Sequence, residues 1–285
     1  MIELCAAALL FAAAPDSLTF DVYDARGQRT ELSAVCEALG DADAVFLGER
    51  HNDATAHALQ LELMAAADTA ARSADRPLVL ALEMVEADVQ PVLDEYLGGL
   101  IRERDWLAAG RPWGNYEADY RPLVEFANSN GHRVVASNAP ARYVGLVSRR
   151  GGVAVLDSLS DAAKATLPPL PIAPPSDELA AKFTALMGGM SHGAGPSVEG
   201  MLAAQNLRDV SMAHHVARAL DRQPGALVVH VNGSFHSENG LGIPEHLARF
   251  APDARQLVVT MQPEDAPLAF EGNDFVIVTR GGIPE

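Results

Sequence analysis

Four strand-like runs, separated by segments of helical pattern, constrain how this chain folds more than any other feature. They span residues 44–47, 77–84, 131–138 and 226–233 and read AVFL, PLVLALEM, GHRVVASN and ALVVHVNG. A strand that is apolar along most of its length has both faces covered, as in a parallel sheet packed between helices. Two further runs follow at 256–261 and 275–279. Strands that alternate with helices predict an α/β fold with a central, mainly parallel sheet flanked by helices.

The rest of the chain predicts additions to this sheet. Residues 18–32 alternate apolar and polar side chains around a glycine, which predicts a hairpin at the sheet edge. Residues 16–285 are expected to form one α/β domain with helical insertions at about 86–128 and 155–200. The first insertion carries four aromatic residues in a chain that is only 6% aromatic, namely Trp106, Trp113, Tyr116 and Tyr120. They predict a small helical subdomain with an aromatic core, and a pocket for a planar ligand is the alternative.

Composition limits the classes of partner. The 285 residues are 48% hydrophobic, which is enough to bury a large core. Lys and Arg number 21 against 38 Asp and Glu, a net charge of −17 that repels phosphate backbones and argues against nucleic acid as a partner. Two cysteines, Cys5 and Cys36, provide neither a disulfide framework nor a structural zinc site.

The first fifteen residues, MIELCAAALLFAAAP, have the apolar centre and small-residue tail of a signal peptide. Glu3 stands where a basic residue is usual, and no small residues precede Cys5, so we predict no lipidation. The apolar centre is too short for a transmembrane helix, which needs about 20 residues. We therefore expect an exported protein of the periplasm or cell envelope without a transmembrane span.

Chemically active side chains follow the ends of the four strands. They are Glu49, His51, Glu83, Asn138 and His236. Because the carboxyl ends of parallel strands meet at one edge of a sheet, where ligands bind, we expect these side chains to share a crevice. A Gly-x-x-His motif occurs twice, at residues 48–51 and 233–236. Two such motifs and a strand-end glutamate predict a metal, cofactor or acid/base site.

Two helices carry further polar candidates. Asp53, His57 and Gln60 have the spacing of one helix face after the first strand, and Asn52 or Asp53 can cap that helix. In a long helix at 197–220, Gln205 and Asp209 share a face, with Arg208 and His215 beside it. These groups are expected either to support the strand-end site or to lie at the surface. The simpler alternative for Glu49 is an ion pair with Arg50.

Several longer motifs carry a family resemblance. They are GERHNDATAHALQ at 48–60, ALEMVEADVQPVLDEYL at 81–97, Trp113 with Tyr120 and Pro122, SNAP at 137–140, AQNLRDVSMA at 204–213 and NGSFHSENGLGIP at 232–244. With them, residues 45–247 resemble the ChaN-like proteins of the haem-binding uptake, Tiki superfamily. The resemblance implies an α/β fold with a small helical subdomain. It also implies an envelope protein that binds haem and its iron.

Haem as cofactor requires an apolar slot, an axial ligand and cations for the propionates. Arg50, Arg142 and Arg208 are candidate cations. The polar side chains expected to bind the cofactor are His51, His57, Gln60, Asn138, Arg208, Asp209 and His236. The resemblance implies a tyrosine as axial ligand, but none of Tyr96, Tyr116, Tyr120 and Tyr143 matches a ligand position residue by residue. The axial ligand is therefore left open, as is assembly into a homodimer that builds part of the pocket.

The wider superfamily supplies an alternative, because the sequence also resembles Tiki-type metal-dependent proteases and erythromycin-esterase-like enzymes. In a metal-dependent hydrolase the catalytic residues would be Glu49, His51, Glu83 and His236. A divalent metal would then be held by His51, Glu83 and His236, with an open position for water. Whether the protein is an enzyme, a haem-binding protein or an inactive scaffold is left open by the sequence, with haem binding placed first.

Overall fold

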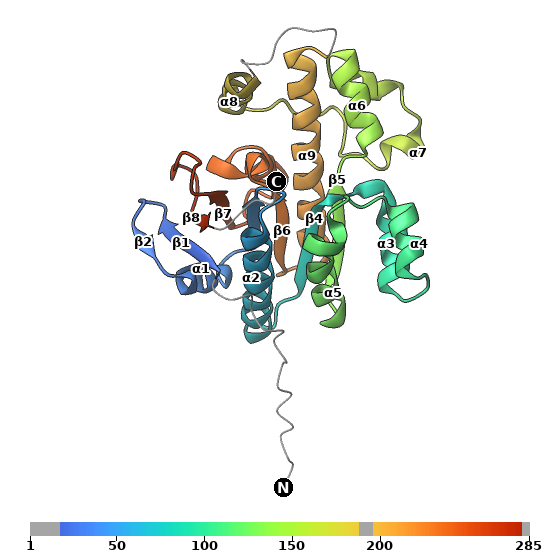
Figure 1. The fold of residues 1–285 in the computed structure, drawn as a ribbon. Coiled ribbons are helices and arrows are strands. Elements are labelled where there is room, and N and C mark those ends of the chain that lie inside the picture. The colour runs from blue at the N-terminus through green and yellow to red at the C-terminus, as the bar shows by residue number, and fades with distance from the viewer. Residues whose placement is uncertain (1–17, 188–195, 281–285) are drawn as a thin grey trace.

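The computed structural model describes residues 18–187 and 196–280, and its centre is an eight-stranded sheet (Figure 1). The strand order is β2-β1-β8-β7-β3-β6-β4-β5. The strands are β1 (Thr19–Asp24), β2 (Arg29–Thr30), β3 (Ala44–Glu49), β4 (Leu78–Glu86), β5 (Arg133–Asn138), β6 (Leu227–Gly233), β7 (Gln256–Pro263) and β8 (Phe275–Arg280). Strands β3 to β8 pair in parallel, and β1 pairs antiparallel with β2 and β8. The predicted α/β fold with a mainly parallel sheet is confirmed, as is the hairpin at its edge.

Helices surround the sheet. The α-helices are α1 (Leu32–Leu39), α2 (Ala54–Ser73), α3 (Gln90–Leu97), α4 (Glu103–Gly110), α5 (Arg121–Ser129), α6 (Ala141–Arg150), α7 (Asp161–Lys164), α8 (Asp177–Met187), α9 (Val198–Arg222) and α10 (Ile243–Phe250). Shorter helical turns are η1 (Ala87–Val89), η2 (Tyr116–Tyr120), η3 (Val153–Ser158), η4 (Ser234–His236) and η5 (Glu238–Gly240). Helices α3 to α5 fall in the first predicted insertion, at about residues 86–128. The second holds α7, α8 and the start of α9, while residues 188–195 lie outside the described part.

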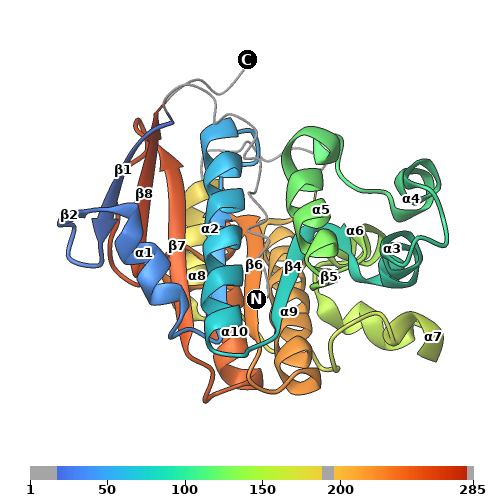
Figure 2. The ribbon, with the colours of Figure 1, turned by 90° about the horizontal axis from the view of Figure 1, so that it is seen from below.

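The two faces of the sheet are covered by different helices (Figure 2). Successive residues of a strand point to opposite faces, so Val45 and Leu47 pack with α1, α2 and α5, while Ala44 and Phe46 pack with α9 and α10. All six residues of β3 are buried. This double coverage explains why the central strands read as continuous apolar runs.

The long helix α9 links the sheet to a second packed region. Its carboxyl half covers the sheet, and its amino half packs against α6 through Val144, Val147 and Leu207. In Figure 1, α6, α7 and α8 stand above the carboxyl ends of the strands. A side chain on the amino half of α9 can therefore reach the edge where β3, β4, β5 and β6 end.

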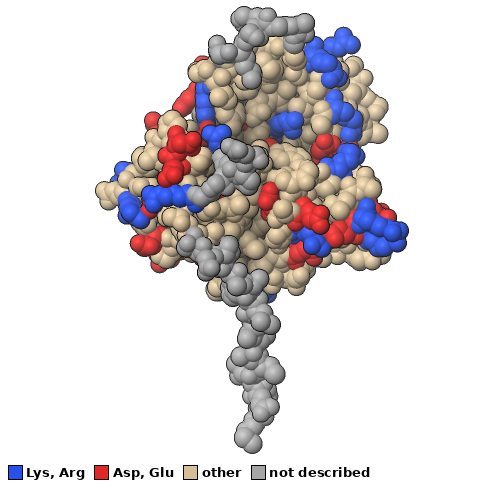
Figure 3. All heavy atoms as spheres, in the orientation of Figure 1, with Lys and Arg blue, Asp and Glu red and all other residues tan. Residues whose placement is uncertain are grey.

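Charge is unevenly distributed over the surface. On the face seen in Figure 3, Lys and Arg side chains gather at the upper right, over α6, while Asp and Glu gather lower down. An acidic protein thus retains local basic surfaces. Within residues 18–187 and 196–280, no helix combines the length and apolar content that a membrane span requires. The predicted signal peptide, residues 1–15, lies outside the described residues.

Candidate functional site

Glu49, the last residue of β3, is the centre of a buried hydrogen-bond cluster, which we call the Glu49 cluster. Its Oε1 accepts hydrogen bonds from His51 Nδ1 at 3.0 Å and from the Tyr120 hydroxyl at 2.6 Å. Its Oε2 accepts from Gln60 Nε2 at 2.6 Å and lies 3.0 Å from His57 Nδ1. Four side chains, from the turn after β3, from α2 and from η2, thus converge on one carboxylate.

These contacts keep Glu49 ionised inside the protein. Burial by itself raises the pKa of a carboxyl group, but the bonds from His51, His57 and Tyr120 outweigh it and lower the pKa of Glu49. Burial likewise opposes the charging of His57, yet Glu49 and Asp119 raise the pKa of His57 to about 9. Glu49 and His57 therefore form a buried ion pair at neutral pH.

His51 is the accessible member of this cluster. Its side chain is 42% exposed, and the edge of its ring lies against Trp113, with ring centroids 4.7 Å apart. A Cβ atom built on Gly233 would lie 2.7 Å from Cε1 and 2.8 Å from Nε2 of this ring. Glycine at position 233 is therefore required for the imidazole to approach the end of β6 so closely.

A second buried group, the Glu83 cluster, surrounds His236. The Nε2 atom of His236 lies 3.2 Å from Glu83 Oε1, and its Nδ1 contacts Asp209 on α9. The other oxygen of Glu83 accepts a 2.7 Å hydrogen bond from the backbone N–H of Gly233. Burial works against the imidazolium, but the two carboxylates raise the pKa of His236 to about 10. Burial opposes the charge of Glu83 as well, yet His236, His51 and the Gly233 N–H lower its pKa to about 2.

The two clusters meet at Gly233, so His51 and His236 lie at the same edge of the sheet. Asn138 joins them there, since its Nδ2 donates to the Glu83 carbonyl at 3.0 Å. Its Oδ1 accepts from Arg208 at 3.3 Å. The strand ends therefore bring these side chains together, as the topology of a parallel sheet requires.

Other candidate residues take different positions. Arg50 does not bond to Glu49 and instead lines a cavity of about 180 Å³ with Glu238 and Gln262. Asp53 caps α2 by accepting from the N–H groups of Thr55 and Ala56. His57, Gln60, Asn138, Asp209 and His236 are all buried, with at most 7% of their surface exposed.

The proposed metal ligands do not form a coordination site. In the described ranges, no group of three or more His, Cys, Asp and Glu side chains is arranged to hold a metal ion. Both ring nitrogens of His236 face carboxylates, and Glu83 also accepts from the Gly233 N–H, so these side chains are engaged with one another. A divalent metal held by His51, Glu83 and His236 stays a prediction.

A family model described as haem-binding uptake, Tiki superfamily, ChaN matches residues 35–247. The chain belongs to this ChaN family. A curated relative, Protein RETICULATA-RELATED 5, chloroplastic, from Arabidopsis thaliana, is 26% identical over 92% of the chain. The chain spans 37% of the length of that relative.

Solved structures support the fold of this ChaN-family protein. The structure described as cofacial heme binding to ChaN of Campylobacter jejuni has a TM-score of 0.69, with 18% identity, and the match covers 92% of this chain and 97% of that one. An erythromycin esterase mutant in its open conformation has a TM-score of 0.45, with 13% identity, over 92% and 83% of the two chains. The first shows a shared fold, and the second is too distant to support an argument.

Sequence reasoning missed the role of Tyr120 in this ChaN-family site. Tyr120 was expected in an aromatic core, which it does join, but its hydroxyl also donates to Glu49. Asn115 likewise donates to the carbonyl oxygen of His51 at 2.9 Å and to Asp119 at 2.8 Å. Both residues lie between β4 and β5, more than sixty positions along the chain from the residues to which they bond. No local sequence pattern could therefore predict these contacts.

The buried imidazolium groups predict a loss of stability at alkaline pH. The pKa values of His57 and His236, about 9 and about 10 in the folded protein, exceed the roughly 6.5 of an unfolded histidine. Their stabilising contribution is therefore complete below about pH 6.5 and is lost as the pH rises through the folded values. We expect the free energy of unfolding, measured in urea, to fall by more than about 1 kcal/mol between about pH 6 and pH 9.5. If the unfolding free energy of His57→Gln falls less over this pH range, His57 accounts for part of the effect. A wild-type unfolding free energy that does not change with pH would contradict the assignment.

Proposed function

We propose that this protein binds haem at the carboxyl edge of its sheet, in iron uptake or handling at the cell envelope. The observation that carries the proposal is membership of the ChaN family, whose description is haem-binding uptake. The solved Campylobacter jejuni relative is described as binding heme cofacially. The side chains of this chain are consistent with such a ligand at the strand ends.

Tyr143 is the tyrosine that we propose as axial ligand. Tyr116 and Tyr120 are almost completely buried, and the hydroxyl of Tyr96 is held by Glu125 at 2.5 Å. Tyr143 is partly exposed in the first turn of α6, five residues after Asn138. The guanidinium of Arg142 lies over its ring, 4.3 Å from the centroid, so a cation stands beside the proposed ligand.

Arg208 is the proposed partner of a haem propionate. It is partly buried on α9, and within the described residues its polar contact is a 3.3 Å hydrogen bond to Asn138. Arg142, by contrast, already contacts Asp88. An arginine at the strand ends without a carboxylate partner is suited to bind one from a ligand.

The buried polar residues would then act indirectly. His57, Gln60 and Tyr120 hold Glu49, and Glu49 in turn orients His51. We propose that His51, the exposed member, faces the ligand while the others fix its position. This differs from the expectation that all seven polar residues bind haem, because five of them are at most 7% exposed, namely His57, Gln60, Asn138, Asp209 and His236.

A hydrolase is the second candidate, and one geometric feature favours it. Glu49 bonds to Nδ1 of His51 at 3.0 Å, which leaves Nε2 free to accept a proton from water or substrate. A carboxylate that orients an exposed imidazole is the usual arrangement of a general base. The arrangement of Glu49 and His51 supports acid/base chemistry by the side chains themselves.

Haemin titration of the purified full-length protein tests the proposal. The wild type is expected to bind haemin with a saturable change in absorption. In Tyr143→Phe the spectrum should shift, because the phenolate ligand is gone, while apolar burial retains measurable binding. Tyr23→Phe, on β1 near the opposite end of the sheet, is the matched control and should give the wild-type spectrum.

The same preparations separate the two candidates. His51→Gln should retain haemin binding if haem is held mainly by Tyr143 and apolar contacts. Absence of saturable haemin binding in the wild type, together with ester hydrolysis that His51→Gln abolishes, would reject haem binding in favour of the hydrolase. A Tyr143→Phe spectrum identical to that of the wild type would reject Tyr143 as the ligand.

A further inference from the structure

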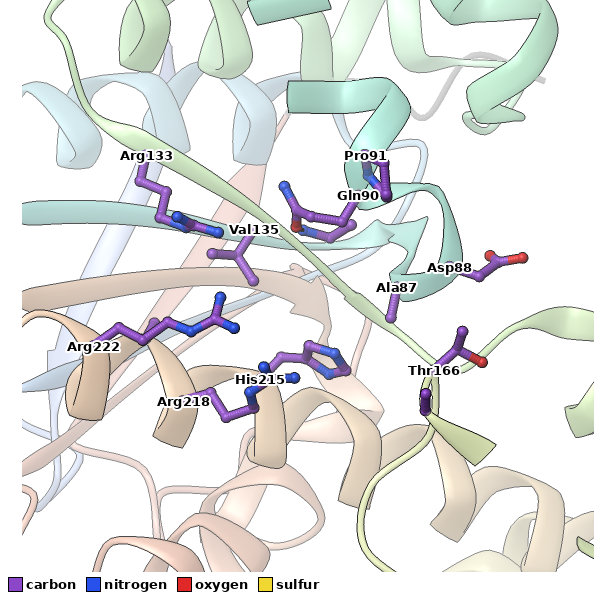
Figure 4. A pocket seen from close by; sticks show the side chains of 13 residues that line it. Ala87, Asp88, Gln90, Pro91, Arg133, Val135, Thr166, His215, Arg218 and Arg222 are labelled. Atoms are coloured by element: carbon purple, nitrogen blue, oxygen red, sulfur yellow. Dashed lines mark hydrogen bonds between the residues drawn. The ribbon is translucent and has the colours of Figure 1, made fainter. Parts of the chain in front are cut away.

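A cavity of about 240 Å³ lies away from the strand-end site, between the edge strand β5 and the carboxyl half of α9 (Figure 4). Arg133 enters it from β5, and Arg218 and Arg222 enter from α9. His215 lies on the same side as the two arginines of α9. The wall thus carries three guanidinium groups in a protein of net charge −17.

These three arginines have no carboxylate partner within the described ranges. Arg111, in the segment between β4 and β5, is by contrast paired with Glu86 and Asp88. Asp88, the acidic residue of the cavity wall, is already bonded to Arg111 and Arg142. The cavity therefore keeps a net positive charge.

The arrangement concentrates positive charge. Arg218 and Arg222 are one helical turn apart near the carboxyl end of α9, and like charges at that spacing repel each other. Arg133 adds a third like charge from the opposite wall. The chain has 38 carboxylates against 21 basic residues, yet in the described part none forms an ion pair with these three arginines. A negative charge from outside the protein would do so.

The remaining polar groups of the wall are already engaged. The Gln90 side chain accepts from the Ala136 N–H at 2.7 Å and donates to the Val134 carbonyl at 3.0 Å. His215 Nδ1 donates to the Ser211 carbonyl at 2.8 Å, and burial lowers the pKa of His215 to about 4, so the ring is neutral. The three arginines are thus the groups left to recognise a ligand.

Size limits what this ligand is. The volume of about 240 Å³ is below the roughly 300–1,000 Å³ of pockets that enclose drug-sized molecules. The cavity shares Arg218 and Ala165 with a neighbouring cavity of about 470 Å³, which runs past Lys164 and Pro168. A small anion fits the first cavity, and an organic group attached to it would extend into the second.

We propose that this cavity is a binding site for a small phosphate-bearing molecule, with the phosphate group held by Arg133, Arg218 and Arg222. A guanidinium presents paired N–H donors that match two oxygens of a phosphate, and several of them neutralise a doubly charged group. The site is separate from the strand-end clusters, so it does not depend on haem binding.

Calorimetric titration of the full-length protein with inorganic phosphate and with glycerol phosphate tests the site. Both are expected to bind saturably, and glycerol phosphate should bind more tightly if its organic part reaches the second cavity. Arg218→Gln and Arg222→Gln should each weaken binding about tenfold, since each removes a charge-assisted contact. Arg26→Gln removes the same charge from the exposed turn between β1 and β2 and should bind as the wild type does.

Three outcomes would overturn the proposal. One is no saturable binding of either probe at millimolar concentration, and another is a loss in Arg26→Gln as large as that in Arg218→Gln. The third is tighter binding of succinate than of phosphate, which would assign the cavity to carboxylates instead. Haemin binding should be unchanged in Arg218→Gln, so failure of this proposal leaves the haem proposal standing.

Discussion

Replacing Glu83 by alanine is expected to destabilise the protein by about 3–5 kcal/mol, because it removes one of the two carboxylates that face the buried His236 imidazolium. Glu83 is 3% exposed and lies 3.2 Å from Nε2 of His236. Its loss also removes the acceptor of the Gly233 N–H. Urea denaturation of the wild type and of Glu83→Ala measures the difference in the free energy of unfolding.

Glu83→Gln is the matched variant, since its amide oxygen still accepts from Gly233 while the negative charge is lost. Its free energy of unfolding should lie between those of the wild type and Glu83→Ala. If Glu83→Ala lost less than about 1 kcal/mol, the pairing with His236 would contribute no more than a surface ion pair does.

Gly242→Ala is the second substitution with a large expected effect. Gly242 has φ 66° and ψ −112°, a backbone conformation essentially confined to glycine. A Cβ atom there would lie 2.5 Å from the carbonyl oxygen of His236 and 3.3 Å from Cγ of Asp209. Backbone strain of about 1–3 kcal/mol adds to this clash. We expect a loss of more than about 2 kcal/mol in unfolding free energy and a lower melting temperature.

Gly151→Ala is the control that distinguishes backbone strain from the steric clash of an added Cβ atom. Gly151 also has a positive φ, 73°, but a Cβ atom there would meet nothing within 4 Å. Gly151→Ala should therefore lose about 1 kcal/mol of unfolding free energy, from backbone strain alone. Equal losses in the two variants would show that contact with the His236 carbonyl is unimportant.

Most of the fold could be read from the sequence because the parallel sheet is covered on both faces. The apolar runs of β3, β4 and β6 leave few other ways to bury those side chains. Asp53 and Ser197 also mark the starts of α2 and α9 by capping them as their residue types suggest. The order of the strands in the sheet carries no such local signal.

The site was predictable only in part, for a physical reason. Residues that end strands, such as Glu49 and His51, are placed by topology alone. What those residues bond to is decided by packing between distant segments. Tyr120 reaches Glu49 across 71 positions, and Glu83 meets the N–H of Gly233 across 150. The periodicity of a single helix or strand contains no information about such pairs.

The amide of Gln90 has a consequence for how copies of this protein meet. A bare edge strand offers its N–H and C=O groups to any other strand, which invites chains to join into larger sheets and to aggregate. On β5, Gln90 occupies both the Ala136 N–H and the Val134 carbonyl, as a neighbouring strand would. At the opposite edge, β2 is only two residues long. Two copies that associate are therefore expected to do so through helices or loops and not by extending the sheet from one subunit into the next.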